Sequence, residues 1–381
     1  MVTKSRIFGF VALALFGLSA RLFAQTASPA EAQALERQGK LDEAARAWGA
    51  VTLHNPADAA AFASLGLVLS REQKYAEAAS AYRRALALNP KLPGVQLNLG
   101  LAEFKQGRFR AAIRPFSAAV AADPHSMQAR TLLGMSYYGA QEFALAAKHL
   151  GIAAKADPGN AELHQALAQS CLKAKQYSCA MDEFRQIVQK DPDSAAAHVL
   201  LGEALDGLDK TPDAAVEFEA AVKAAPREPE VHFGLGFLYW KLQRYDEAQH
   251  AFENELAIDA DHAQSLAYLG DIEVKRNNPE KALPLLGKAV QLDNGIRMAY
   301  LDLGHVFTEQ KRYKEALTAL RRAEALDPSE PDAHYMLARV YKATGDAAAS
   351  KEEFDKARDL HQKAEDDVAS KVRKYPPAPT P

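Results

Sequence analysis

Cysteine is scarce in this sequence, since only Cys171 and Cys179 occur among 381 residues. Two cysteines are too few for a small fold built on disulfides or for an array of zinc sites. A large excess of charge of one sign is also absent: the formal net charge is −3, which disfavours a strongly basic nucleic-acid binder. Hydrophobic residues make up 48% and charged residues 25%, a balance typical of a folded protein rather than of a disordered one.

The sequence also lacks the short motifs that accompany common enzyme chemistry. It contains no G-x-x-x-x-G-K-[ST] loop to cradle a phosphate and no C-x-x-C pair. Gly234 and Gly236 resemble the start of a dinucleotide-binding motif, but Tyr239 stands where the third glycine belongs. No pair of residues suggests a general acid and base. We therefore predict a protein that is not an enzyme, with no catalytic residue, no metal and no cofactor.

A hydrophobic run long enough to span a membrane is not present near the start of the chain. The uncharged run 7–20 follows Lys4 and Arg6, and is shorter than the roughly 20 residues that a membrane span needs. This pattern is typical of a secretory leader, so residues 1–24 are predicted to be a signal peptide cut after Ala24. An uncleaved signal anchor is the alternative, and is the one membrane contact that we expect. No cysteine follows the run, which excludes a lipoprotein anchor.

A period of 34 residues fills the rest of the chain. Proline recurs at this spacing or a multiple of it, and Asn or Asp comes before all but one of these prolines. An Asx-Pro pair ends a helix, because proline cannot continue it and forces the preceding residue out of the α region. The recurring prolines are Pro56, Pro90, Pro124, Pro158, Pro192, Pro226 and Pro328.

Small residues recur at two places within each period. When residue 25 is counted as position one, position eight is Gly or Ala, position twenty is almost always Ala, and position twenty-four is mostly a large apolar residue. A glycine inside a helix costs about 1 kcal/mol relative to alanine, so its repeated use predicts close packing of a neighbouring helix. Position fifteen is predicted to be a turn, most clearly at Gly39, Gly107, Asn277 and Gly345. Each period is therefore expected to form two antiparallel helices.

This pattern resembles the tetratricopeptide repeat (TPR) family, and within it the exported bacterial proteins that consist of such repeats alone. The period at 229–262 carries it well, with Leu235, Gly236, Tyr239, Ala248 and Phe252. The resemblance implies an all-α, right-handed superhelical solenoid of about ten helix-turn-helix repeats, with residues 365–381 forming the end of a capping helix and a Pro-rich tail. The implied repeats are 25–58, 59–92, 93–126, 127–160, 161–194, 195–228, 229–262, 263–296, 297–330 and 331–364.

The resemblance also implies where a partner binds. In this family, positions two, five, nine and twelve of the first helix of each repeat line a concave groove. Here they form two apolar patches separated by a polar, partly acidic stretch that contains Glu203 and Asp206. The alternative is that a tight superhelix buries part of this face against the next repeat. The candidate binding residues are Leu67, Leu97, Leu101, Phe104, Met135 and Tyr138 in one patch, and Phe233, Phe237 and Trp240 in the other.

Two further sets of residues need an interpretation. Cys171 and Cys179 flank the turn of one repeat, so either a disulfide or two separate thiols can be expected. His164, His198, His232 and His334 recur at position four. Neighbouring helices pack about 8–10 Å apart, too far for equivalent positions to share a metal easily, so we interpret these histidines as packing residues.

Together these observations predict a non-enzymatic scaffold of the cell envelope that binds a peptide or helix of a partner protein in its groove. A self-associating structural solenoid, and a non-catalytic subunit of an envelope assembly, secretion or glycan-related complex, are the alternatives. We expect a protein or peptide partner and no nucleic acid, and a homo-oligomer stays open. The predicted location is periplasmic or secreted, with an inner-membrane anchor facing the periplasm as the alternative.

Overall fold

The computed structural model describes residues 28–374, and it describes side chains up to residue 367. The predicted leader, 1–24, and the Pro-rich residues 375–381 lie outside the described residues. The regular elements of the described range are twenty α-helices, so the expected all-α fold of about ten helix pairs is confirmed. The first ten helices are α1 (Pro29–Arg37), α2 (Leu41–His54), α3 (Ala59–Arg71), α4 (Tyr75–Leu88), α5 (Val95–Lys105), α6 (Phe109–Ala122), α7 (Met127–Gly139), α8 (Phe143–Ala156), α9 (Ala161–Lys173) and α10 (Tyr177–Lys190). The others are α11 (Ala195–Asp206), α12 (Thr211–Ala224), α13 (Val231–Lys241), α14 (Tyr245–Ile258), α15 (Ala263–Lys275), α16 (Pro279–Leu292), α17 (Arg297–Glu309), α18 (Tyr313–Leu326), α19 (Pro331–Thr344) and α20 (Ala347–Lys374).

The first helix of several repeats begins at a side-chain cap. Asp58 Oδ1 accepts a hydrogen bond from the backbone N–H of Ala61 at 3.0 Å, and Asn160 Oδ1 accepts one from Leu163 at 3.1 Å. Such caps satisfy an N–H group that has no partner within the helix, typically contributing about 1 kcal/mol. The recurring Asx-Pro turn therefore ends one helix, and a polar residue a few positions later starts the next.

The turn inside every repeat has the same backbone conformation. All ten residues at position fifteen have a positive φ, between 57° at Lys175 and 83° at Gly345. The sequence marks this turn clearly at three Gly residues and one Asn. The other six positions hold residues with longer or charged side chains, most of which rarely adopt the left-handed region. The set is Gly39, Gln73, Gly107, Gln141, Lys175, Asp209, Gln243, Asn277, Lys311 and Gly345.

Position eight and position twenty-four form the contact between the two helices of a repeat. A Cβ atom added to Gly236 would lie 2.7 Å from Phe252 Cδ1, and one added to Gly134 would lie 2.7 Å from Leu150 Cγ. Gly66, Gly100, Gly202, Gly270 and Gly304 show the same relation to the residue sixteen positions later. The predicted role of these glycines as packing sites is confirmed.

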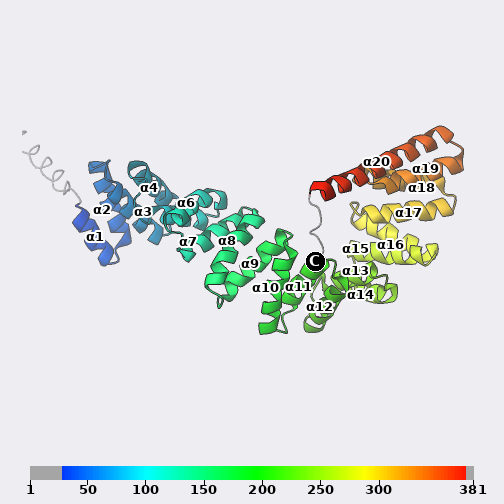
Figure 1. Cartoon of the computed structure of the whole chain (residues 1–381), viewed down its shortest axis with the longest axis horizontal. Coiled ribbons are helices and arrows are strands. Elements are labelled where there is room, and N and C mark those ends of the chain that lie inside the picture. Colours follow the sequence, from blue (N-terminus) through cyan, green and yellow to red (C-terminus); the bar gives the residue numbers. More distant parts are fainter. Residues whose placement is uncertain (1–27, 375–381) are drawn as a thin grey trace, which may run out of the picture. The chain divides into compact units, whose positions relative to one another are not determined.

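The helices form two compact units, one reaching to Glu183 and the other beginning at Phe184. Buried apolar clusters span neighbouring repeats: in the second unit Leu286 of α16 and Leu303 of α17 belong to one cluster. Figure 1 shows the helix pairs following one another in chain order within each unit. A repeat thus buries its apolar face against the next repeat as well as within itself.

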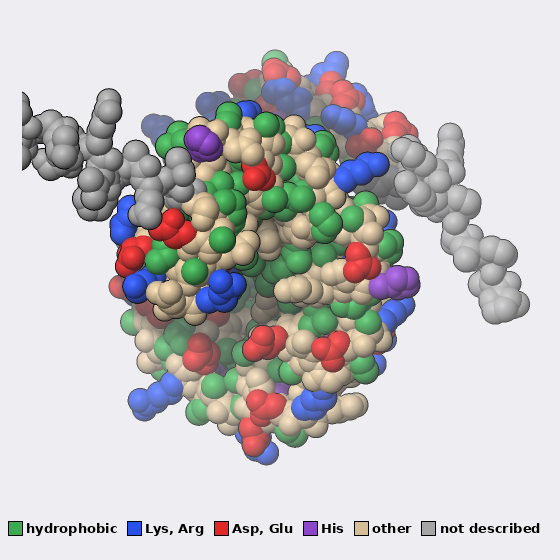
Figure 2. Space-filling model, turned by 90° about the vertical axis from the view of Figure 1, so that its left-hand side faces the viewer, with side chains coloured by type: hydrophobic (Ala, Val, Ile, Leu, Met, Phe, Trp, Pro, Cys, Tyr) green, Lys and Arg blue, Asp and Glu red, His purple; other side chains and the backbone are tan. Residues whose placement is uncertain are grey.

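The surface carries both signs of charge. Figure 2 shows acidic and basic side chains interspersed among apolar and polar ones on the face that it draws. Among the described helices, none is both long enough and apolar enough to cross a membrane.

Candidate functional site

A pocket of about 800 Å³ lies between α11 and α13 in the second unit, and we call it the α11–α13 pocket. Its apolar lining includes Val199 and Leu200 of α11, Phe218 of α12, and Phe233 and Phe237 of α13. Gly234 brings α13 directly onto Phe218, because a Cβ atom there would collide with the Phe218 ring. The small residue therefore lets the two repeats approach closely at this pocket.

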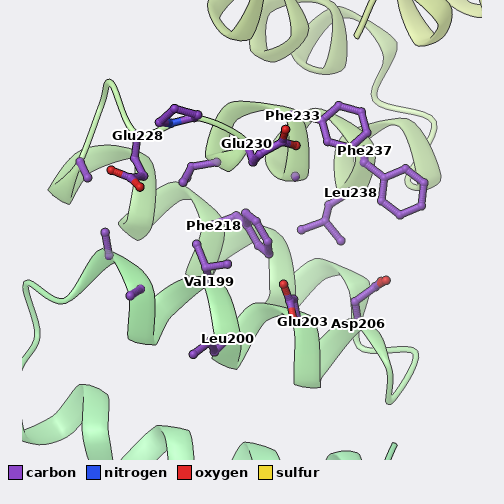
Figure 3. A pocket seen from close by; sticks show the side chains of 16 residues that line it. Val199, Leu200, Glu203, Asp206, Phe218, Glu228, Glu230, Phe233, Phe237 and Leu238 are labelled. Atoms are coloured by element: carbon purple, nitrogen blue, oxygen red, sulfur yellow. The ribbon is translucent and has the colours of Figure 1, made fainter. Parts of the chain in front are cut away.

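Four carboxylates surround this apolar lining. Glu203 and Asp206 come from α11, and Glu228 and Glu230 come from the loop that leads into α13. Figure 3 shows the two pairs on opposite sides, with Val199 between them. The sixteen lining residues include no Lys, Arg or His. The pocket therefore combines an apolar interior with an acidic rim.

The start of α13 is held by a buried acid from the neighbouring helix. Glu255 is 1% exposed, and its carboxylate accepts hydrogen bonds from the backbone N–H groups of Glu230 at 2.9 Å and Phe233 at 3.1 Å. A negative charge at a helix N-terminus is stabilising. Glu230 itself has a φ of 71°. This cap fixes the segment that carries Glu230 and Phe233 into the pocket.

A histidine braces the same segment from α15. The Nδ1 atom of His262 accepts a hydrogen bond from the backbone N–H of Ser265 at 3.1 Å, so Nε2 carries the proton of the neutral ring. That Nε2 donates to Glu230 Oε1 at 3.2 Å. The His262 ring also lies 5.0 Å from the Phe233 ring. The rim at Glu230 is therefore positioned by contacts from two neighbouring helices.

The three predicted aromatic residues of this repeat lie together, with the Phe237 and Trp240 ring centroids 6.1 Å apart, but only two of them line the pocket. Phe233 and Phe237 are half-buried and line the α11–α13 pocket. Trp240 does not line it: its Nε1–H donates to Asp271 Oδ2 at 2.6 Å, and its ring lies 5.1 Å from the Tyr268 ring. The alternative applies in part to all three residues, because Tyr268 of the next repeat also contacts the Phe233 and Phe237 rings at 5.9 and 5.7 Å.

Asp302 forms a second electrostatic feature in the same unit. Its Oδ2 atom is buried and has no hydrogen-bond partner among the described residues. Burial, and then the negative charge of Asp271, raise the pKa of Asp302 to about 8, while Lys275 opposes the shift. Lys275 donates to Asp271 at 2.7 Å. Between the unfolded pKa near 4 and the folded pKa near 8, only the folded state holds the proton, so stability falls as pH rises through this window.

Comparison with protein-family models connects this geometry to a known family. A model described as Tetratricopeptide repeat matches residues 30–93, 97–161, 131–195 and 233–296, more than half of the chain. The chain belongs to the tetratricopeptide repeat family. Further TPR models match 172–232, 304–345 and 331–360. Proteins with this fold are typically non-catalytic and generally serve as scaffolds for protein–protein interaction.

Solved TPR structures are similar to this chain at low sequence identity. The Cut9–Hcn1 hetero-tetramer of APC/C matches with a TM-score of 0.50 and 14% identity, covering 87% of this chain and 80% of that chain. YrrB, described as a TPR protein with an unusual peptide-binding site, matches with a TM-score of 0.39 and 23% identity, covering 49% of this chain and 97% of its own. No curated protein matches the sequence. These likenesses concern the fold alone.

The predicted binding residues of the first TPR patch have varied surroundings. Leu97, Leu101 and Phe104 are partly buried against a core cluster that contains Phe116. Leu97 also lines a separate pocket of about 490 Å³, whereas Leu67 is 39% exposed. This part of the patch thus contributes to the packing between repeats.

The two other residues of this patch lie on α7. Met135 is half-buried. Tyr138 donates to Gln169 Oε1 of the next repeat at 3.5 Å, and its ring lies 5.5 Å from the Phe143 ring. Tyr138 therefore joins two neighbouring repeats.

The structure joins Cys171 and Cys179 in a disulfide, with the two Cα atoms 5.8 Å apart. This bond connects α9 to the first turn of α10, across the turn at Lys175. The sequence left open whether the two thiols are bonded, and the TPR geometry brings them within disulfide distance.

Three of the position-four histidines have a carboxylate partner that the sequence analysis missed. His164, His198 and His334 each place Nδ1 2.6 Å from a glutamate oxygen nineteen residues later in the same repeat. The recurring His-x₁₈-Glu spacing is the signal that could have revealed these pairs. For His334, Glu353 and the nearby Glu324 could also hold a metal ion, although Lys356 already pairs with Glu353 at 3.0 Å.

The rim residues Glu228 and Glu230 also escaped the sequence analysis. Glu228 lies in the turn between repeats, outside the four positions at which groove residues were sought, whereas Glu230 occupies position two of its repeat and was missed because only apolar candidates were chosen in that repeat. The acidic Glu228-Pro229-Glu230 turn was the available signal. The equivalent residue in the third repeat is Gly94, with a φ of 74°. The repeat 229–262 therefore has a charged residue, Glu230, at a left-handed position where the third repeat has glycine.

Proposed function

We propose that this TPR protein is a non-enzymatic scaffold of the cell envelope that binds a segment of a partner protein in the α11–α13 pocket. The observation that carries the proposal is the pocket itself, where half-buried Phe233 and Phe237 line an apolar interior of about 800 Å³. Phenylalanine is among the residue types enriched at the buried core of protein–protein interfaces.

Two features support a protein segment as the occupant. The family generally serves protein–protein interaction. In addition, the pocket is built from the first helices of two successive repeats and the loop between them, so a segment lying across these helices contacts both.

The proposed location outside the cytoplasm rests on the leader pattern of residues 1–24 and on the disulfide. Disulfides persist in oxidising compartments and are rare in the cytosol, so the Cys171–Cys179 bond is consistent with export.

The proposal is tested by affinity capture from envelope extracts with the full chain and two variants. Ala196 is exposed and lines the pocket, so Ala196→Trp fills the pocket without removing a core side chain. Tyr335→Ala, at a residue of α19 that is 52% exposed and lies outside this pocket, is the control for a change elsewhere on the surface. Circular dichroism checks that both variants are folded.

We expect a partner that the wild type and Tyr335→Ala retain and that Ala196→Trp loses, with cross-links from the partner to α11 or α13. Equal retention by all three proteins would place binding elsewhere and contradict the proposal. Absence of a partner, together with a mass in solution that rises with concentration, would favour the self-associating alternative.

A further inference from the structure

We infer that the α11–α13 pocket selects a basic segment, in which an apolar side chain is flanked by Lys or Arg. This inference rests on the proposed function, because it names the class of segment that the same pocket binds. The reason is the combination, within one set of lining residues, of an apolar interior and four carboxylates.

The charge of the pocket departs from that of the chain. The whole sequence is nearly balanced, with 46 basic and 49 acidic residues. The pocket lining instead has four acids and no base. A cleft lined by one sign of charge attracts the opposite charge and raises its local concentration. The local excess therefore favours a cationic partner over a neutral or acidic one.

One base close to the pocket offsets part of this excess. Lys241 lies 2.6 Å from Asp206 and 5.8 Å from the Phe237 ring. Asp206 also accepts a hydrogen bond from Thr211 at 2.8 Å. With Lys241 included, the four carboxylates still leave a net negative rim. His262, which donates to Glu230, is neutral when its Nδ1 atom accepts from Ser265.

The buried Glu255 makes capping of α13 by the loop acids unnecessary. The N-terminus of α13 would otherwise attract a carboxylate from the loop before it. Glu255 already accepts the N–H groups of Glu230 and Phe233. The side chains of Glu228 and Glu230 are therefore not needed to cap the helix, and both residues are exposed.

The arrangement in Figure 3 suggests how such a segment lies. Val199 and Phe218 stand between the Glu203–Asp206 side and the Glu228–Glu230 side. An apolar side chain resting on Val199 and Phe218 would have carboxylates on both sides of it. Basic residues on both sides of that apolar residue then pair with the rim.

The test uses three short fluorescent peptides with the same Leu and Phe positions. All other positions are Lys in the first peptide, Gln in the second and Glu in the third. Binding to the full-length protein is measured by fluorescence anisotropy at low and at physiological salt. We expect the Lys peptide to bind at least about tenfold more tightly than the Gln peptide, with an affinity that falls as salt rises.

Variants separate the rim from the general surface. Glu203→Gln with Glu228→Gln removes two rim charges. Glu253→Gln with Glu280→Gln removes two exposed charges from the second helices α14 and α16 and is the matched control. We expect the rim variant to lose most of the preference for the Lys peptide and the control to keep it.

The outcomes distinguish this inference from the function on which it rests. If the Gln or Glu peptide binds as tightly as the Lys peptide and Ala196→Trp abolishes that binding, the pocket binds segments but charge selection is refuted. If the Lys peptide binds the wild type, the rim variant and Ala196→Trp equally, it binds the general surface and the inference is wrong. If none of the three peptides binds, the inference is refuted, while capture with the wild type and Ala196→Trp decides the proposed function separately.

Discussion

Gly270→Ala and Gly287→Ala are the same substitution in the two helices of one TPR repeat, and we expect them to have different effects on stability. Gly270 of α15 faces the fully buried Leu286: a Cβ atom there would lie 2.5 Å from Leu286 Cδ2 and 2.6 Å from Cγ. Gly287 of α16 has nothing within 4 Å of the same added atom.

The magnitudes follow from two opposing effects. Alanine is favoured over glycine inside a helix by about 1 kcal/mol, and both variants gain this amount. Forcing an extra carbon into a packed core typically costs about 1–3 kcal/mol, and only Gly270→Ala pays it. Gly287→Ala should therefore raise the free energy of unfolding by about 1 kcal/mol, whereas Gly270→Ala should leave it unchanged or lower it by up to about 2 kcal/mol.

The measurement is urea unfolding of the full chain by far-UV circular dichroism, combined with amide hydrogen exchange in α15 and α16. Hydrogen exchange is needed because a repeat array can unfold in more than one step. Gly49→Ala, another helical glycine with open space around the added atom, is the control and should behave like Gly287→Ala. Equal stabilisation by Gly270→Ala and Gly287→Ala would refute the argument that position eight is closely packed.

Three further predictions concern other parts of the chain. Cys179→Ser removes a disulfide between residues eight positions apart, and should lower the free energy of unfolding by about 2–3 kcal/mol if the bond acts by restricting the unfolded chain. The melting temperature should fall, and a reductant should no longer change it. Asp302→Asn should stabilise the protein by an amount that grows with pH up to about 8 and is constant above it; urea unfolding at several pH values checks this, and a gain independent of pH would contradict it. Gln141→Gly removes a side chain from a residue with a φ of 64° and should raise the free energy of unfolding by about 0.5–1 kcal/mol, measured by urea unfolding.

The sequence predicts the helix pairs well because the 34-residue period determines which residues face each other. Gly134 and Leu150 could be paired from their register, and the structure places them in contact. The conformation of the turn is harder to read. Lys175 adopts a positive φ like Gly39, although nothing about lysine favours it. The packing of the two helices imposes that conformation, and tertiary contacts override local propensity.

The candidate site was predictable only in part. Phe233, Phe237 and Glu230 follow from positions five, nine and two of their repeat, but Glu228 lies in the turn between repeats, where the helical register gives no guidance. The sequence analysis also placed Glu203 in a polar stretch and Phe233 and Phe237 in a separate apolar patch. Successive first helices lie side by side, so residues of different repeats line one pocket.

The same side-chain hydrogen bond joins two pairs of neighbouring repeats, and it cannot form at the α11–α13 pocket. Tyr138 and Trp240 occupy position twelve, and each donates a hydrogen bond to position nine of the next repeat, thirty-one residues later. At the α11–α13 pocket the same two positions hold Asp206 and Phe237. A carboxylate and a phenyl ring cannot form that hydrogen bond. Asp206 pairs with Lys241 instead, and both Asp206 and Phe237 remain on the pocket wall. The pair that fails to join the repeats is therefore an acid beside an apolar ring, which are the two features that a basic segment with an apolar anchor needs.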